Sequence, residues 1–489
     1  MRQVEQTKLE EKLRRVFPKA VVYKCASQQK LFASLSIPPY LRDWLVQRFA
    51  GDDGQVDVEQ ARSYIERYLP GRKDWEHLKQ RMIDGEPIRF LAKVTAQVDV
   101  SEGVGLFELP DLSFPKRQYE AVIDPKLLQD EEKREALLGH PEAWGVVELI
   151  WRVMPLRTQK EQGRCVMVDF KPFRPYRVDL GYYRQAREEF STEEWIDVLL
   201  MGMDYNPNGF ASEKQKLAML CRLLPFVEPR LNLMELAPKG TGKSYVFSQL
   251  SKYGWLLSGG IVTRAKLFYD MNRRQQGLVA RYDYVALDEI QTIKLQEESE
   301  VRGALKGYME SGEYRVGNQE GVGQAGIVLL GNIEHSRMDE NKDLLAELPS
   351  AFRESALIDR FHGFLKGWDI PRMHENLKAT GWALNTEFFS EILHALRTDI
   401  GYRALVDDLV VVPRGADTRD TEAIKRLACG LLKLLFPNAV ERGVELELFG
   451  RYCLEPAKAM RQIIRTQLSM MDGEYYPFIP DIVLRLPLP

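Results

Sequence analysis

The feature that most constrains this chain is the segment Ala237-Pro-Lys-Gly-Thr-Gly-Lys-Ser244, which stands between a short apolar run and a helical pattern. Leu231–Leu236 predicts a strand, and Tyr245–Leu250 predicts the start of a helix. In this context a glycine-rich loop points backbone N–H groups at a phosphate, and the helix N-terminus adds partial positive charge. The segment therefore predicts an α/β domain with a nucleotide-binding P-loop.

The residues of this loop have separate predicted roles. The glycines allow a tight turn, Lys243 neutralises the β- and γ-phosphates, and the Ser244 hydroxyl coordinates Mg²⁺. The usual pattern begins with glycine, whereas this one begins with Ala237, so we expect a slightly different entry to the loop. We predict ATP and Mg²⁺ as the cofactors. The predicted nucleotide-binding residues are Lys239, Gly240, Thr241, Gly242, Lys243, Ser244 and Tyr245.

Two further apolar runs end in polar residues. The run that begins at Tyr284 ends in Asp288 and Glu289, and the run that begins at Gly326 ends in Asn332. Ligands gather at the carboxyl ends of the strands in open α/β sheets. We expect Asp288 to hold Mg²⁺, Glu289 to polarise the attacking water, and Asn332 to orient that water. For Asn332 the alternative is an ordinary residue of a strand-end turn.

Two arginines are candidates for contact with the transferred phosphoryl group. Arg360 stands where a ring ATPase projects an arginine into its neighbour's site, with Arg353 as the rival. The alternative for Arg360 is a salt bridge with Asp359 or another acid. Arg419 lies near the start of a predicted helix and is expected to reach the nucleotide; the alternative is a solvated side chain.

Basic residues in two segments are candidate DNA contacts. A glycine-rich hairpin or loop is predicted between Glu289 and Asn332, and Lys306, Arg315 and Gln319 are expected to face a pore there; the alternative is an ordinary hairpin tip. Residues 171–187 interleave arginines and tyrosines, including Arg174 and Arg177. Such a segment grips phosphates and stacks on bases, or it is a connector packed on a neighbouring domain.

The rest of the sequence indicates three parts. We predict an N-terminal domain over residues 1–191 that is mixed α+β and includes a small β-barrel or sandwich after residue 88, an α/β core over 192–372, and a helical lid over 373–489. The net charge of −3 neither supports nor excludes a nucleic-acid role. Five dispersed cysteines indicate buried thiols, and the lack of a signal peptide or long apolar run predicts a cytoplasmic protein without a membrane span.

With these motifs assembled, the chain resembles the BrxL family, the Lon-related AAA+ proteins of BREX phage-defence systems. The similar stretches include Met234-Glu-Leu-Ala-Pro-Lys-Gly-Thr-Gly-Lys-Ser-Tyr-Val246, Val285-Ala-Leu-Asp-Glu289, Gly307-Tyr-Met-Glu-Ser-Gly312, Leu330-Gly-Asn-Ile333 and Asp359-Arg-Phe-His-Gly-Phe364. The neighbourhoods of Arg360 and Arg419 are also similar to minichromosome maintenance helicases. The resemblance implies an AAA+ core and a DNA-associated N-terminal domain. It also implies a homo-hexamer or stacked double ring, with double-stranded DNA and other BREX components as partners.

The sequence departs from the family at its C-terminal end. The family usually carries a Lon-like proteolytic domain with a Ser–Lys dyad, whereas the predicted lid here runs to about Met471. We therefore expect no peptidase activity. Three functions remain open: a DNA-binding ATPase ring, a polypeptide remodeller whose pore uses Tyr308 or Tyr314, and a nucleotide-gated DNA clamp with slow hydrolysis.

Overall fold

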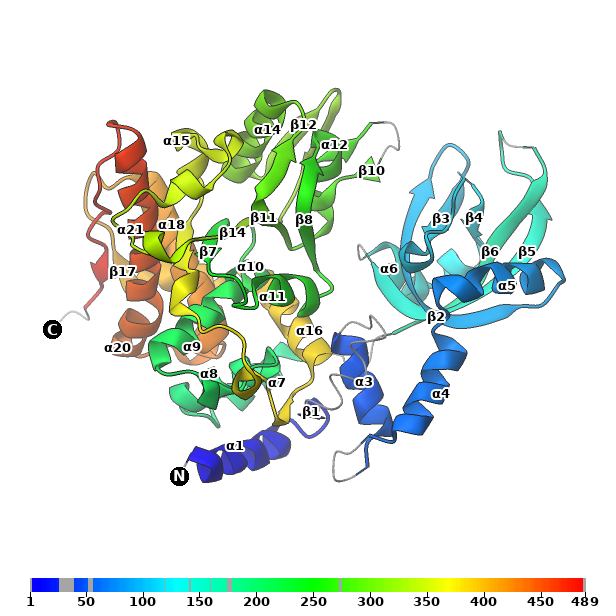
Figure 1. The fold of residues 1–489 in the computed structure, drawn as a ribbon, viewed down its shortest axis with the longest axis horizontal. Coiled ribbons are helices and arrows are strands. Elements are labelled where there is room, and N and C mark those ends of the chain that lie inside the picture. The colour runs from blue at the N-terminus through cyan, green and yellow to red at the C-terminus, as the bar shows by residue number, and fades with distance from the viewer. Residues whose placement is uncertain are drawn as a thin grey trace. The chain divides into compact units, whose positions relative to one another are not determined.

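The structure is a computed structural model, and it describes residues 2–25, 39–51, 56–117, 119–139, 142–158, 160–173, 178–271 and 275–486. The chain divides into two compact units (Figure 1). The smaller unit is Leu45–Arg177, and the larger unit combines Met1–Trp44 with Val178–Pro489. The division differs from the predicted boundaries, because residues 1–44 and 178–191 belong with the phosphate loop and the helical region is not a separate unit.

The smaller unit is a closed barrel whose strand order is β2-β3-β4-β6-β5. Strands β4 and β6 pair in parallel, and the other neighbouring pairs are antiparallel. Aromatic residues such as Trp75, Phe90 and Phe170 fill its core. The strands are β2 (Ile88–Asp99), β3 (Val104–Glu108), β4 (Ala121–Ile123), β5 (Ala143–Met154) and β6 (Gln162–Pro172), and the accompanying helices are α4 (Val58–Tyr68), α5 (Arg72–Ile83) and α6 (Glu131–Leu138).

The larger unit is built on a parallel sheet in the order β15-β7-β14-β11-β8. Its strands are β7 (Leu233–Ala237), β8 (Gly254–Val262), β11 (Tyr284–Leu295), β14 (Gly326–Asn332) and β15 (Gly363–Lys366). Every residue of β7 is buried, as expected for a strand covered on both faces. Strand β14 lies between β7 and β11, so three strand ends that carry predicted site residues are neighbours.

Small pairs of strands complete the larger unit. An antiparallel hairpin of β12 (Glu313–Val316) and β13 (Gln319–Val322) follows helix α14 (Glu298–Ser311). Near the N-terminus, β1 (Val21–Lys24) pairs with β16 (Gly381–Leu384), which ties residues 2–25 to the larger unit. The remaining pairs are β9 (Tyr269–Asp270) with β10 (Gln275–Gln276), and β17 (Val410–Val411) with β18 (Val483–Leu484).

Helices surround the sheet and form the C-terminal region (Figure 1). Ile463, Ile464 and Leu468 of α21 are buried in the same core as the sheet. The first helices are α1 (Arg2–Val16), α3 (Pro39–Phe49), α7 (Leu180–Arg187), α8 (Thr192–Gly202), α9 (Glu213–Leu220), α10 (Leu224–Val227), α11 (Lys243–Gln249), α12 (Arg264–Leu267) and α13 (Leu278–Arg281). The later ones are α15 (Ser355–Ile358), α16 (Thr386–Arg397), α17 (Gly401–Leu409), α18 (Thr418–Leu435), α19 (Ala439–Arg442), α20 (Leu446–Phe449) and α21 (Glu455–Met471).

Two sequence-based expectations about the whole chain can be compared with the structure. Cys165, Cys221, Cys429 and Cys453 are free and buried, as the dispersed spacing predicted, whereas Cys25 is half-buried. In the part of the chain that the structure describes, no helix combines the length and the apolar character that crossing a bilayer needs.

Candidate functional site

The phosphate loop connects β7 to α11 at the carboxyl edge of the sheet. Gly240 and Gly242 have φ values of 84° and 78°, a left-handed conformation that favours glycine. A side chain at Gly242 would also collide with the Tyr205 hydroxyl, 2.3 Å from the position of its Cβ. Ala237 is the last residue of β7 and does not adopt a positive φ, so alanine fits this position without strain.

The loop brings together four of the predicted site residues. Lys243 Nζ donates to Asn332 Oδ1 at 3.1 Å, and Ser244 Oγ donates to Asp288 Oδ2 at 2.5 Å. Burial lowers the pKa of Lys243, and among the described residues no carboxylate lies within ion-pair distance of its ammonium group. A buried cation without an anionic partner fits a phosphate, and a hydroxyl beside a carboxylate fits Mg²⁺.

Glu289 leaves the regular path of β11. Its φ is 52°, uncommon for a residue with a side chain, and the pairing of β11 with β8 shifts between Asp288 and Ile293. Its backbone N–H donates to Asp288 Oδ1 at 2.9 Å. A bulge of this kind re-aims a side chain, and strained backbone gathers at functional sites. The exposed Glu289 carboxylate stands at the same edge as the loop.

A buried ion pair beneath the loop was missed in the sequence analysis. Arg222 and Glu235 are completely buried and lie 2.6 Å apart. Arg222 also donates to the carbonyl of Thr241 at 2.7 Å and to its hydroxyl at 3.2 Å, so it fixes the middle of the loop. The available signal was Glu235 itself, because a carboxylate inside an apolar strand requires a partner.

The structure gives the last residue of the predicted nucleotide-binding set a different environment. The Tyr245 hydroxyl donates to Asp204, which also forms ion pairs with Lys24 at 2.6 Å and with Arg42 at 2.9 Å. Although burial raises it, these two cations hold the pKa of Asp204 well below its usual range. The Tyr245 side chain therefore links α11 to the N-terminal segment of the larger unit. Lys239 is exposed beside the loop.

The two candidate arginines lie at the opposite edge of the sheet. Arg360 precedes β15, and its carbonyl accepts from Asn232 Nδ2, just before β7, at 3.1 Å. The loop follows the other end of β7, about 16 Å away for a strand of this length. Arg419 contacts Asp359 at 2.9 Å, so it belongs to this amino edge too. Neither guanidinium therefore stands at the phosphate loop of its own chain.

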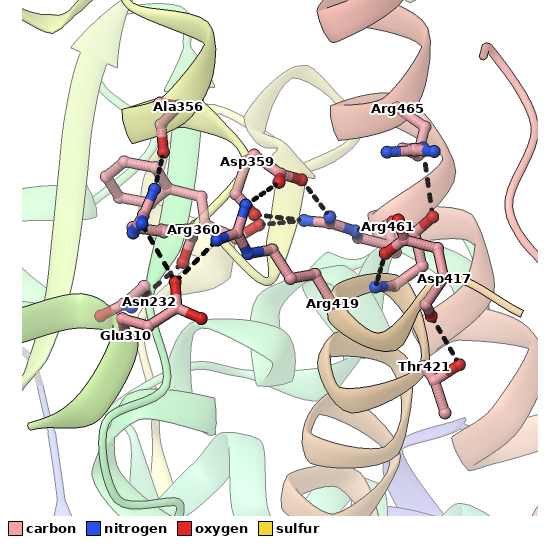
Figure 2. A network of polar contacts seen from close by, with 12 residues as sticks. Asn232, Glu310, Ala356, Asp359, Arg360, Asp417, Arg419, Thr421, Arg461 and Arg465 are labelled. Carbon is pink, nitrogen blue, oxygen red and sulfur yellow. Dashed lines mark hydrogen bonds and ion pairs between the residues drawn. The ribbon is translucent and has the colours of Figure 1, made fainter. Parts of the chain in front are cut away.

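An open cavity of about 200 Å³ lies at this amino edge. Four arginines line it, and three acids face them. Figure 2 shows that Glu310 approaches both candidate arginines: its Oε2 lies 3.1 Å from Arg360 and 3.0 Å from Arg419. The lining arginines are Arg230, Arg360, Arg419 and Arg426, and the acids are Glu310, Asp359 and Glu422.

The cavity holds more donors than acceptors. Among the described residues, the Nε groups of Arg230, Arg360 and Arg426 are buried without a hydrogen-bond partner. Asp359 is already shared by Arg419 and Arg461 (Figure 2). Unpaired buried donors are costly, and an anionic ligand would satisfy them. The rival arginine, Arg353, lies outside this set and pairs with Asp343 at 3.4 Å.

The candidate DNA contacts are dispersed. Lys306 lies on α14 rather than on the hairpin, and its ammonium pairs with Glu354 at 2.6 Å. Arg315 and Gln319 are exposed on β12 and β13, where a hairpin was one of the two predicted forms. Arg174 and Arg177 lie outside the described residues. In the described remainder of that segment, Arg184 and Arg187 make internal contacts, as a connector would.

The parallel sheet and the loop geometry define an ATPase domain of the P-loop type. Comparison with protein families is more specific: the model "Lon-like protease BrxL-like, ATPase domain" matches residues 165–479, and "BREX system Lon protease-like protein BrxL N-terminal" matches residues 15–151. The chain therefore belongs to the BrxL family.

Two curated relatives agree with this assignment, and both are called Lon-like protease BrxL. The chain is 29% identical to the protein of Escherichia coli O9:H4 (strain HS) over 94% of its own length, and 33% identical to that of Bacillus cereus (strain H3081.97) over 62%. It spans 64% and 45% of the lengths of these relatives.

Proposed function

We propose that this chain is a ring-forming AAA+ ATPase that binds double-stranded DNA and couples ATP hydrolysis to DNA binding or translocation in BREX-type phage defence. It acts in the cytoplasm, as a homo-hexamer or a stacked double ring. The proposal rests mainly on one observation: the residues predicted to hold and cleave ATP lie at one edge of the sheet, and the two candidate arginines lie at the other. A complete site then requires two copies of the chain.

Each residue at the carboxyl edge has a defined task in this proposal. The backbone of residues 240–244 and the ammonium of Lys243 hold the β- and γ-phosphates of ATP. Ser244 and Asp288 hold Mg²⁺, which neutralises charge on the phosphates. Glu289 polarises the attacking water, and Asn332 orients it. Arg360 and Arg419 of a neighbouring copy stabilise the charge that develops on the γ-phosphate.

DNA as the partner is supported by two features. The smaller unit is a five-stranded barrel, an architecture that binds oligonucleotides in OB-folds. The β12–β13 hairpin presents Arg315, whose side chain is 71% exposed. A polypeptide remodeller is less favoured, because Tyr308 and Tyr314, its candidate pore residues, are buried. A nucleotide-gated DNA clamp would have the same fold as the proposed ATPase ring and would differ from it in its slower hydrolysis of ATP.

The test is steady-state ATP hydrolysis by the purified chain, with and without double-stranded DNA, at one low salt concentration. We expect hydrolysis that DNA stimulates several-fold. Clear hydrolysis without a response to DNA would support the remodeller instead. Tight ATP binding with negligible turnover would support the clamp. Lys243→Ala, assayed in parallel, controls for a contaminating ATPase.

A further inference from the structure

Glu310 is the acid that connects the two candidate arginines. One of its oxygens, Oε2, forms an ion pair with a terminal nitrogen of Arg360 and accepts a hydrogen bond from a terminal nitrogen of Arg419 (Figure 2). The other terminal nitrogen of Arg360 donates to the carbonyl of Ala356, and that of Arg419 donates to Asp359. The Glu310 carboxylate therefore occupies a donor of each arginine that a phosphate oxygen would otherwise use.

A phosphate and the Glu310 carboxylate compete for these guanidinium groups. Both are anions, and at contact distance in a partly buried cavity their repulsion is substantial. If the γ-phosphate of a neighbouring copy reaches Arg360 and Arg419, Glu310 has to withdraw. Arg360 and Arg419 therefore cannot contact the γ-phosphate of a neighbouring copy while Glu310 contacts them.

The position of Glu310 is mechanically tied to the β12–β13 hairpin. Glu310 lies in the last turn of α14, and only Ser311 and Gly312 separate it from β12. Gly312 closes the helix with a φ of 82°, and its carbonyl accepts from the N–H of Gly323, just after β13, at 2.8 Å. A displacement of the hairpin therefore moves the end of the helix that carries Glu310.

We infer that Glu310 is a positioning residue that holds Arg360 and Arg419 back until DNA displaces the β12–β13 hairpin. This inference rests on the proposed function, in which the hairpin meets DNA and the arginines act on a neighbouring copy. DNA binding that moves Glu310 away from the arginines favours their contact with the phosphate of a neighbouring copy. Because linkage is reciprocal, that contact in turn favours the DNA-bound position of the hairpin. Glu310 thereby supplies the restraint that makes hydrolysis depend on DNA.

The test is a set of four purified proteins: wild type, Glu310→Gln, Glu447→Gln and Arg360→Ala. Glu447→Gln is the matched control, because it makes the same change in charge at an exposed position of α20, outside both α14 and the hairpin. For each protein, kcat and KM for ATP are measured with and without double-stranded DNA. Thermal melting shows whether Glu310→Gln is folded.

We expect Glu310→Gln to raise the DNA-free kcat about fivefold, to reduce the stimulation by DNA correspondingly, and to leave KM unchanged, because the phosphate loop lies at the other edge. Glu447→Gln should behave like wild type. If Arg360→Ala is impaired while folded Glu310→Gln has the kcat and stimulation of wild type, or a lower kcat, the inference is wrong and the proposed function stands. If Arg360→Ala turns over like wild type, the proposed function fails and the inference fails with it.

Discussion

The two edges of the central sheet carry different kinds of site. At the carboxyl edge, side chains from successive strands contact one another within one chain, as in the pairs Lys243–Asn332 and Ser244–Asp288. At the amino edge, Arg360 and Arg419 share the carboxylate of Glu310, and among the described residues three buried arginine Nε groups lack hydrogen-bond partners. The fold of one chain thus brings the side chains of the carboxyl edge into contact, whereas the amino edge has donors that no other described residue of the chain uses.

The largest expected effect is a change in kcat, and it tests the role of the arginines at the amino edge. If Arg360 contacts the γ-phosphate at a neighbouring copy, as proposed, its replacement by alanine should lower kcat by about 10³-fold while ATP affinity is retained. Steady-state kinetics and nucleotide titration measure the two quantities. Arg353→Ala is the matched control, since Arg353 pairs with Asp343 outside the cavity, and an equal loss of kcat there would remove the special role of Arg360.

The buried ion pair between Arg222 and Glu235 allows a test of what holds the phosphate loop at the carboxyl edge. Arg222→Met leaves Glu235 buried without a partner, so the free energy of unfolding should fall by about 3–5 kcal/mol. Urea denaturation measures this change. The double variant Arg222→Met/Glu235→Leu removes both charges and should recover most of the loss. Equal stability of wild type and Arg222→Met would show that the pair does not hold the loop.

The next prediction concerns the affinity of the phosphate loop for ATP. Lys243→Ala removes the buried cation of the loop, so ATP affinity should fall about 100-fold, in the range of lost charge-assisted hydrogen bonds. Titration with a fluorescent ATP analogue checks this value. Ser248→Ala, one turn further along α11, is a control that should retain affinity. Unchanged affinity of Lys243→Ala would remove Lys243 from the site.

The smallest effect concerns the hairpin. Arg315→Ala should weaken binding of double-stranded DNA about threefold at every sequence and reduce the salt slope by about 1, as expected for the loss of one phosphate contact. Fluorescence anisotropy at several salt concentrations measures both. Arg442→Ala, at a similarly exposed arginine outside the hairpin, should leave binding unchanged. The same loss in both variants would indicate nonspecific attraction instead of a contact at the hairpin.

The local patterns in the sequence predicted the carboxyl edge well. The apolar runs before Ala237, Asp288 and Asn332 form adjacent strands, because buried parallel strands and their polar ends are a local signal. The contacts between side chains at the amino edge could not be predicted from local sequence patterns. That Glu310 meets Arg360 and Arg419 depends on how α14, the segment before β15 and α18 pack, which no periodicity reveals. For the same reason the pairing of β1 with β16, and with it the extent of the larger unit, was missed.

The most direct test of a site shared between copies is hydrolysis by mixtures of Arg360→Ala and Glu289→Gln. Each variant alone should be nearly inactive, because one lacks the arginine and the other lacks the group that polarises water. In a mixed ring, the phosphate loop of an Arg360→Ala copy meets the intact Arg360 of a Glu289→Gln copy. We expect ATP hydrolysis to rise with mixing and to be greatest near equal proportions, whereas no gain at any ratio would contradict a site completed by a neighbouring copy.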